Sequence, residues 1–272
     1  MISKGVGFPV ALIPGIQGRW EWMQPTVEAL TAGHRVMSWS LGELRPDGAT
    51  DATFLAWMHA LDRAFDNVHE RRLSLIGVSF GGLIAAAYAA RRPERVTSLI
   101  LASVPSPVWK PTRGDRFCVN YPRLAMPYFA GRAIGRTGPE LLRARDSWPE
   151  RLRLGLKYAS RVMSAPLDPV ASARWAREWQ DHDLSGECAR IIAPTLVVTG
   201  EPEFDKVVPV DHSMEYVRLI PGATHITLAG TGHIGVVTKP ARFAEIAGKF
   251  IYDVNTAERV TPRALERARH AS

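Results

Sequence analysis

The chain has 272 residues, 46% of them hydrophobic, and a chain of this size can bury the core of one large α/β domain without disulfides. Its cysteines, Cys118 and Cys188, therefore predict two reduced thiols in preference to a single bridge. The net charge is +7, but no zinc-ligand spacing, recognition-helix motif or aromatic–basic motif accompanies it, so nucleic acid is not an expected partner.

The positive charge is concentrated in one segment. Residues 105–190 hold 13 Arg and 2 Lys against 9 acidic residues, which places +6 of the total +7 there. This excess predicts a solvated Arg-rich surface or, alternatively, an anionic substrate close to the segment. No apolar run is long enough to span a membrane, and the first residues lack the layout of a secretory signal. We expect a cytoplasmic protein without a membrane partner.

Short apolar runs alternate with helical patterns in the first hundred residues. The runs typical of buried strands are 9–13, 35–41, 73–78 and 96–103. The segments between them with apolar residues at helical spacing are 22–30, 53–70 and 82–92. Continuous apolar strands joined by helices predict a parallel sheet covered on both faces, and right-handed crossovers make it doubly wound.

After Ser103 this alternation stops. Residues 105–190 are rich in proline, arginine and aromatic residues, with no convincing strand. Helical stretches in this segment lie near 138–144, 150–163 and 169–180. The strand–helix alternation then resumes, with strands at 194–199 and 225–229 and helices at 209–219 and 240–252.

These elements predict an α/β core with an inserted helical cap. The core comprises residues 1–104 and 191–254, and the cap residues 105–190. The tail, 255–272, is expected to add one exposed helix that starts at Thr261-Pro262.

A serine motif follows the third predicted strand. The residues Gly77-Val78-Ser79-Phe80-Gly81-Gly82 match the pattern G-x-S-x-G with an extra glycine. An apolar strand ends at Val78 and a helix of small residues begins just beyond Ser79, which is the strand–turn–helix setting of a nucleophile elbow. Glycines flank the serine because side chains there would clash with the neighbouring strand and helix.

This motif in its context resembles the α/β-hydrolase family, and the resemblance covers residues 9–252. Members usually have eight strands, the second antiparallel, but only eight residues precede the first predicted strand here. The resemblance therefore implies that the two edge strands are missing or reduced, which leaves a mostly parallel sheet of about six strands. The family order of catalytic residues is serine, then acid, then histidine.

Four histidines follow Ser79 late enough in the chain to serve as the base: His212, His225, His233 and His270. His233 lies in a glycine-rich turn, 230–235, just past the last strand, and so at the edge of the sheet where Ser79 lies. His225 begins that strand and belongs at the opposite edge. His233 is therefore the predicted base.

The acid is expected after strand 194–199. Asp205-Lys206-Val207-Val208-Pro209 resembles the acid-x-x-Val-Pro pattern of the family, although the gap from Gly200 is about two residues longer than usual. Asp205 is the predicted acid, with Glu203 as the alternative. The resemblance further implies that an oxyanion hole is formed by the backbone N–H of Phe80 and one from the loop after the first strand, at Ile16 or Gln17, with Ile16 preferred.

The resemblance implies acyl transfer through a Ser79–His233–Asp205 triad, with no metal and no organic cofactor. The default substrate is a small to medium carboxylic ester, and the protein is expected to be a monomer or homodimer. The serine nucleophile argues against haloalkane dehalogenases and epoxide hydrolases, which attack with aspartate. Two alternatives remain: a carbon–carbon bond hydrolase or lyase acting on a carboxylate-bearing substrate, and a ligand receptor that retains the triad.

The segment 105–190 also contains aromatic residues that could line an apolar pocket. They are Trp109, Phe117, Tyr121, Tyr128, Phe129, Trp148, Trp175 and Trp179. Packing of helices against the core is the more common role of such residues, and we expect it for most of them.

Overall fold

The computed structural model describes residues 1–45, 54–144, 147–180 and 182–270, with side chains up to Ala257. In this part of the chain seven strands form one sheet, in the order β1-β3-β2-β4-β5-β6-β7. The strands are β1 (Ile2–Lys4), β2 (Phe8–Ile13), β3 (His34–Ser38), β4 (Leu73–Val78), β5 (Val96–Ala102), β6 (Thr195–Thr199) and β7 (Thr224–Thr227).

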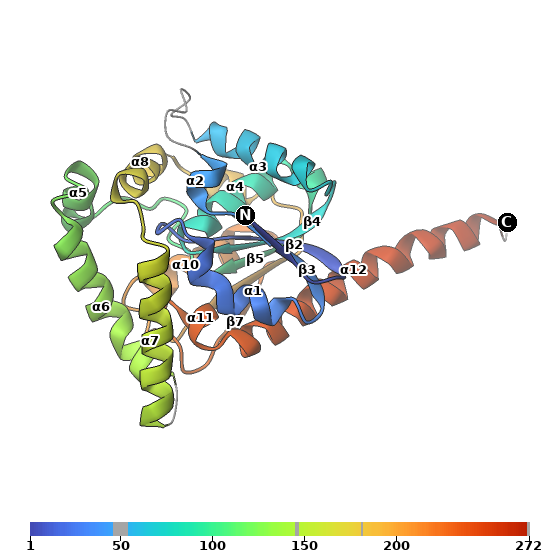
Figure 1. Ribbon diagram of the computed structural model, residues 1–272. Coiled ribbons are helices and arrows are strands. Elements are labelled where there is room, and N and C mark those ends of the chain that lie inside the picture. The colour runs from blue at the N-terminus through green and yellow to red at the C-terminus, as the bar shows by residue number, and fades with distance from the viewer. Residues whose placement is uncertain (46–53, 145–146, 181, 271–272) are drawn as a thin grey trace.

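The predicted fold class, a doubly wound and mostly parallel α/β sheet, is confirmed. Strands β2 to β7 pair in parallel, and β1 pairs antiparallel with β3, from Ile2 opposite Ser38 to Lys4 opposite Val36. The three-residue β1 is thus a reduced edge strand, in a segment too short for its apolar pattern to predict a strand. Figure 1 shows the strands at the centre of the molecule and helices on either side.

Side chains of successive strand residues point to opposite faces, and each face has its own core. Val10 and Leu12 of β2 pack in a cluster with residues of α1 (Gln24–Leu30) and α12 (Pro240–His270). Ala11 and Ile13 pack on the other face, with residues of α3 (Leu55–Asn67) and α4 (Phe80–Arg91). The start of the helix predicted at residue 53 lies outside the described residues. The remaining helices of the core are η1 (Trp20–Met23), α2 (Leu41–Leu44), η2 (Pro93–Arg95), α10 (Val210–Leu219) and α11 (Gly235–Thr238).

Among the predicted boundaries, those of the second strand and of the tail helix differ most from the structure. The strand predicted over 35–41 ends at Ser38, because Ser40 begins the short helix α2 and donates its N–H to the Glu43 carboxylate at 2.7 Å in a capping box. The separate tail helix predicted from Thr261 is instead a continuation of α12, which runs without a break to His270. No glycine after Gly248 is present to end the helix. Pro262 lies within α12 but does not end it.

The segment between β5 and β6, residues 105–190, is here called the insertion. It consists of helices, without a strand among its described residues. They are α5 (Arg113–Asn120), α6 (Met126–Arg143), α7 (Trp148–Ser164), α8 (Pro169–Gln180) and α9 (Ser185–Cys188). Figure 1 shows α6 and α7 side by side at the edge of the molecule. Only the end of α6 was predicted, because three glycines and Pro139 within the helix weaken its pattern.

Helix α8 joins the insertion to the core through a buried ion pair. Arg45 donates to the Glu178 carboxylate at 2.9 Å, and both side chains are at most 5% exposed. The indole N–H of Trp57 donates to the same carboxylate at 3.0 Å. None of the described helices combines the length and apolar character that a membrane crossing requires.

Candidate active site

Ser79 occupies a strained turn between β4 and α4. Its φ of 52° and ψ of −124° lie outside the regions that non-glycine residues normally adopt, at a cost of about 1–3 kcal/mol. Neighbouring glycines permit this turn. A Cβ on Gly81 would lie 2.3 Å from the Ile13 carbonyl oxygen, and one on Gly77 would lie 2.5 Å from the Cα of Gly82. The backbone therefore presents the half-buried Ser79 side chain at the carboxyl end of the parallel strands.

His233 reaches Ser79 from the loop between β7 and α11. Its Nε2 lies 3.1 Å from the Ser79 Oγ, within hydrogen-bonding distance for proton transfer. Its side chain is 12% exposed, so the contact is largely shielded from water. The placement follows from topology, since β4 and β7 are parallel members of one sheet and their carboxyl ends share an edge.

Asp205 lies on the other side of the imidazole. Its Oδ2 is 3.4 Å from the His233 Nδ1, at the long end of hydrogen bonding. Its Oδ1 accepts the N–H groups of Val207 at 3.0 Å and Val208 at 2.9 Å, which fixes the orientation of the carboxylate. Glu203, the alternative acid, has an exposed side chain. The structure thus brings Asp205, and not Glu203, to His233.

The loop after β2 lies against the serine. A Cβ on Gly15 would come 3.3 Å from the Ser79 Cβ, and the N–H of Gly18 closes a turn onto the Gly15 carbonyl at 2.8 Å. Within the described part of the chain, neither Ile16 nor Gln17 donates its N–H to a backbone acceptor. Phe80, the other predicted donor, is the first residue of α4, where N–H groups lack intrahelical partners.

The other histidines have different surroundings. His225 lies in β7, where its Nε2 bonds the Thr199 hydroxyl at 2.8 Å and burial lowers its pKa. His212 lies in the first turn of α10 and His270 at the end of α12. Of the four candidates, His233 is the one that the structure brings to Ser79.

Comparison with known proteins identifies the family. Residues 12–240 match the profile of the family described as alpha/beta hydrolase fold. The chain belongs to the α/β-hydrolase family. It is 26% identical over 266 residues to 2-hydroxymuconate semialdehyde hydrolase of Pseudomonas sp. (strain CF600), covering 94% of this chain and 90% of the relative.

Two further similarities extend this comparison. The chain is 24% identical over 276 residues to poly(3-hydroxyalkanoate) depolymerase of Ectopseudomonas oleovorans, covering 94% of this chain and 88% of the relative. Its fold is similar to the crystal structure of the enol-lactonase from Burkholderia xenovorans LB400, with a TM-score of 0.77, 20% identity, and coverage of 92% of this chain and 95% of the other.

The insertion of this α/β hydrolase contacts the site through two residues that the sequence analysis did not identify. Ser172 of α8 donates its hydroxyl to the Ile16 carbonyl at 2.9 Å. Glu140 of α6 is 3% exposed, and its carboxylate accepts the N–H of Ile234, the residue after His233, at 3.0 Å. Burial raises the pKa of Glu140, although its hydrogen bonds and the nearby His233 oppose that shift. A lone Ser or Glu in a helix has no sequence signal that reveals these contacts.

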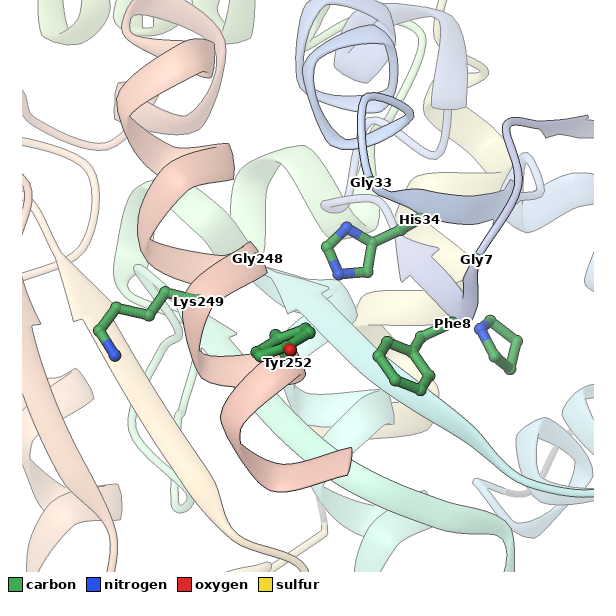
Figure 2. A pocket seen from close by; sticks show the side chains of 8 residues that line it. Gly7, Phe8, Gly33, His34, Gly248, Lys249 and Tyr252 are labelled. Carbon is green, nitrogen blue, oxygen red and sulfur yellow. The ribbon is translucent and has the colours of Figure 1, made fainter. Parts of the chain in front are cut away.

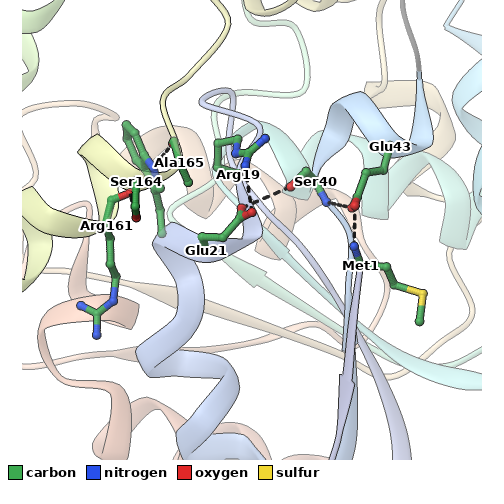
Figure 3. Close-up of polar contacts among 9 residues, drawn as sticks. Met1, Arg19, Glu21, Ser40, Glu43, Arg161, Ser164 and Ala165 are labelled. Carbon is green, nitrogen blue, oxygen red and sulfur yellow. Dashed lines mark hydrogen bonds and ion pairs between the residues drawn. The ribbon is translucent and has the colours of Figure 1, made fainter.

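A second junction between insertion and core lies at the end of α7. The indole N–H of Trp22 donates to the carbonyl of Ala165 at 2.9 Å. Figure 3 shows this junction beside a chain of polar contacts in which Arg19 pairs with Glu21 at 2.8 Å, and Glu21 in turn accepts the Ser40 hydroxyl at 3.3 Å. The loop after β2 is thus held from both the core and the insertion.

Two aromatic residues of the insertion pack on the core. Trp175 and Trp179 are buried, and the Trp179 ring lies edge-on to Phe80, 6.4 Å between centroids. Trp148 and Tyr121, by contrast, are 65% and 59% exposed. The packing role expected for most of these residues therefore holds for the tryptophans of α8.

Two clefts lie at different places on this α/β hydrolase. One, of about 690 Å³, lies at the amino-terminal ends of β2 and β3, and Figure 2 shows Phe8, His34 and Tyr252 lining it. Ligands of open parallel sheets bind at the carboxyl ends, so this cleft lies at the opposite end from the candidate site. Another, of about 250 Å³, lies beside the loop after β2 and is lined by Gln17 and Trp175 among others.

Proposed function

We propose that this α/β hydrolase is a serine hydrolase that cleaves small to medium carboxylic esters through an acyl-enzyme on Ser79. One observation carries the proposal: the Ser79 Oγ, held on a strained turn, lies 3.1 Å from the His233 Nε2, and Asp205 lies beside the other ring nitrogen. A nucleophile, a base and an orienting acid within reach of one another are the requirement for acyl transfer.

The proposed reaction has two halves. His233 accepts the Ser79 proton as the Ser79 oxygen bonds to the acyl carbon, and the negative charge passes to the carbonyl oxygen. The N–H groups of Phe80 and Ile16 stabilise that oxyanion, and the bond to the leaving alcohol breaks as His233 protonates it. His233 then deprotonates a water that attacks the acyl-enzyme, which releases the acid and restores Ser79. The chemistry requires no metal or organic cofactor.

We further propose that the insertion is a cap over the site. The bonds from Ser172 to the loop after β2 and from Glu140 to the His233 loop support this assignment, because the insertion touches both sides of the proposed catalytic apparatus. The cytoplasmic location, the small-molecule partner and the monomeric or homodimeric state remain predictions.

A carbon–carbon bond hydrolase acting on a carboxylate-bearing substrate is the second candidate. The observation that favours it is the similarity, over 94% of the chain, to a relative named for hydrolysis of 2-hydroxymuconate semialdehyde. The Arg-rich insertion suits an acidic substrate. The similarity to a relative named poly(3-hydroxyalkanoate) depolymerase, and the similar fold of an enol-lactonase, favour acyl-ester chemistry instead.

A panel of nitrophenyl esters of increasing acyl length tests the proposal, with Ser79→Ala as control. We expect turnover that Ser79→Ala lowers by several orders of magnitude. Equal turnover by both proteins would refute Ser79 as the nucleophile. Fast labelling of Ser79 by a fluorophosphonate without ester turnover would favour the carbon–carbon hydrolase, and saturable ligand binding with neither activity would favour a receptor.

A further inference from the structure

We propose that Glu140, on helix α6 of the insertion, is a positioning residue for His233: its carboxylate holds the backbone directly after the histidine and so makes proton transfer at Ser79 depend on the placement of the insertion. The inference rests on the proposed function of Ser79 and His233. It concerns a residue that makes no direct contact with the serine.

The contacts of Glu140 converge on the His233 loop. Its Oε2 accepts the N–H of Ile234 at 3.0 Å, and its Oε1 accepts the Thr238 hydroxyl at 3.2 Å. The backbone N–H of Gly232, the residue before His233, acts like that of Ile234 to lower the pKa of this carboxyl. One side chain thus binds the peptide group that follows the imidazole-bearing residue and the hydroxyl of Thr238 in α11.

The loop needs such support because glycine supplies much of it. Gly230, Gly232 and Gly235 lie within six residues, and glycine has the largest conformational freedom to lose. Gly232 cannot be replaced by a stiffer residue, since a Cβ there would lie 2.3 Å from the Phe204 carbonyl oxygen and 2.8 Å from the Glu140 Oε2. The loop must therefore be ordered by its neighbours.

The core supplies one anchor and the insertion the other. Glu201, directly after β6, accepts the N–H of Gly230 at 2.8 Å and donates its own N–H to the Thr231 carbonyl at 2.8 Å. These bonds hold the loop before His233. Ile234 and Thr238, which follow His233, are bonded to Glu140. Without Glu140, the half of the loop beyond the histidine would lose its anchor on the insertion.

A carboxylate is an expensive group to bury, which makes a packing role alone a poor explanation for Glu140. It is the buried residue of α6 and is 3% exposed. Unpaired buried charge is strongly unfavourable, whereas N–H donors to a carboxylate form bonds about twice as strong as neutral ones. A leucine would fill similar space without the desolvation penalty, but it could not accept the N–H of Ile234 or the hydroxyl of Thr238.

The test compares Glu140→Leu, which keeps the volume and removes the acceptors, with Glu140→Gln, which keeps an acceptor oxygen. Glu150→Leu, at an exposed position in the first turn of α7, is the matched control.

We expect Glu140→Leu to lower kcat on nitrophenyl esters, and the rate of fluorophosphonate labelling of Ser79, by roughly 10- to 100-fold, since a misplacement of about 1 Å has effects of this size. KM should change little, Glu140→Gln should recover most of the loss, and Glu150→Leu should match the wild type. A wild-type kcat in Glu140→Leu would overturn the inference.

A second measurement keeps the test independent of activity. Hydrogen–deuterium exchange at Ile234 should be faster in Glu140→Leu by about an order of magnitude, and close to wild type in Glu140→Gln. Unchanged exchange in Glu140→Leu would overturn the inference, whether or not the wild-type protein turns over esters. If Glu140→Leu does not fold, Glu140→Asp replaces it, because the shorter side chain withdraws the carboxylate from the Ile234 N–H, and the same outcomes apply. If Ser79 in the wild type does not label but exchange changes as expected, the proposed function is refuted and the contact of Glu140 with the His233 loop is not.

Discussion

The Ser172 hydroxyl donates a 2.9 Å hydrogen bond to the Ile16 carbonyl oxygen, across 156 positions of the chain. One residue lies on helix α8 of the insertion and the other in the loop that packs against Ser79. In a planar trans peptide, the C=O of Ile16 and the N–H of Gln17 point in opposite directions. The bond therefore fixes the Ile16–Gln17 peptide, which directly follows Ile16, the residue whose N–H is the proposed oxyanion donor.

Replacement of Ser172 by alanine should lower kcat by about 2- to 10-fold, because a hydrogen bond of this kind contributes about 0.5–1.5 kcal/mol. KM should change less, since oxyanion donors act mainly in the transition state. Steady-state kinetics on nitrophenyl esters measures both constants. Ser164→Ala is the control, because the exposed Ser164 donates only to the Arg161 carbonyl of its own helix. Equal kcat values for the two variants would show that Ser172 does not support the loop.

Asp205→Asn should reduce kcat by roughly 10³- to 10⁴-fold, the size of effect seen when an imidazole loses its orienting carboxylate. The asparagine keeps the volume but presents a different donor–acceptor set to His233 and to the N–H groups of Val207 and Val208. Glu203→Gln should behave like the wild type, because Glu203 is exposed. The same ester assay applied to both variants discriminates the two acids, and a reversed order of effects would assign the role to Glu203.

Local signals were sufficient to predict the elbow. The predicted strand 73–78 coincides with β4, because an uninterrupted apolar run is followed directly by a glycine-rich turn. His233 and Asp205 were predictable for a topological reason: residues that follow parallel strands meet at one edge of the sheet. The choice of Asp205 over Glu203 depended in addition on the resemblance of residues 205–209 to the acid-x-x-Val-Pro pattern of the family.

Contacts made by the insertion could not be predicted in this way. Ser172 and Glu140 act through the packing of helices on the core, and a helical pattern does not say which loop a given side chain will meet. Helix α6 was itself underestimated, since Gly131, Gly135 and Gly138 lower helix propensity, yet tertiary context overrides it. The loop after β2 likewise offers N–H groups at both Ile16 and Gln17, since neither donates to a backbone acceptor in the described part of the chain.

Gly81→Ala should destabilise the protein by about 1–3 kcal/mol or more, because the new Cβ would lie 2.3 Å from the Ile13 carbonyl oxygen and 2.4 Å from that of Pro14. Both atoms are backbone and cannot rotate away. Gly155→Ala is the matched change inside a helix with no atom within 4 Å of the new Cβ, and it should stabilise by about 0.5–1 kcal/mol. Urea unfolding gives both values. An unchanged unfolding free energy in Gly81→Ala would mean that the crowding there is relieved by movement of the neighbouring backbone.

The pair between Arg91 and Glu187 should make stability depend on pH. Arg91 donates to both carboxylate oxygens, at 2.7 and 2.6 Å, and the Glu187 side chain is 8% exposed. Burial acts to raise the pKa of Glu187, but the hydrogen bonds and charge of Arg91 outweigh it and leave the pKa below its ordinary value of 4.5. The folded state therefore binds this proton less readily than the unfolded state does.

It follows that the contribution of Glu187 is fully present above pH 4.5 and is lost as the pH falls through its lowered folded pKa. Glu187→Gln should cost about 1–3 kcal/mol of unfolding free energy at pH 7, and the difference from the wild type should shrink as the pH falls from 4.5 towards 3. Urea unfolding of both proteins across this range measures it. Glu94→Gln, at an exposed position near the same end of α4, should show no such trend. A difference that is constant with pH would mean that Glu187 titrates alike in the folded and unfolded states.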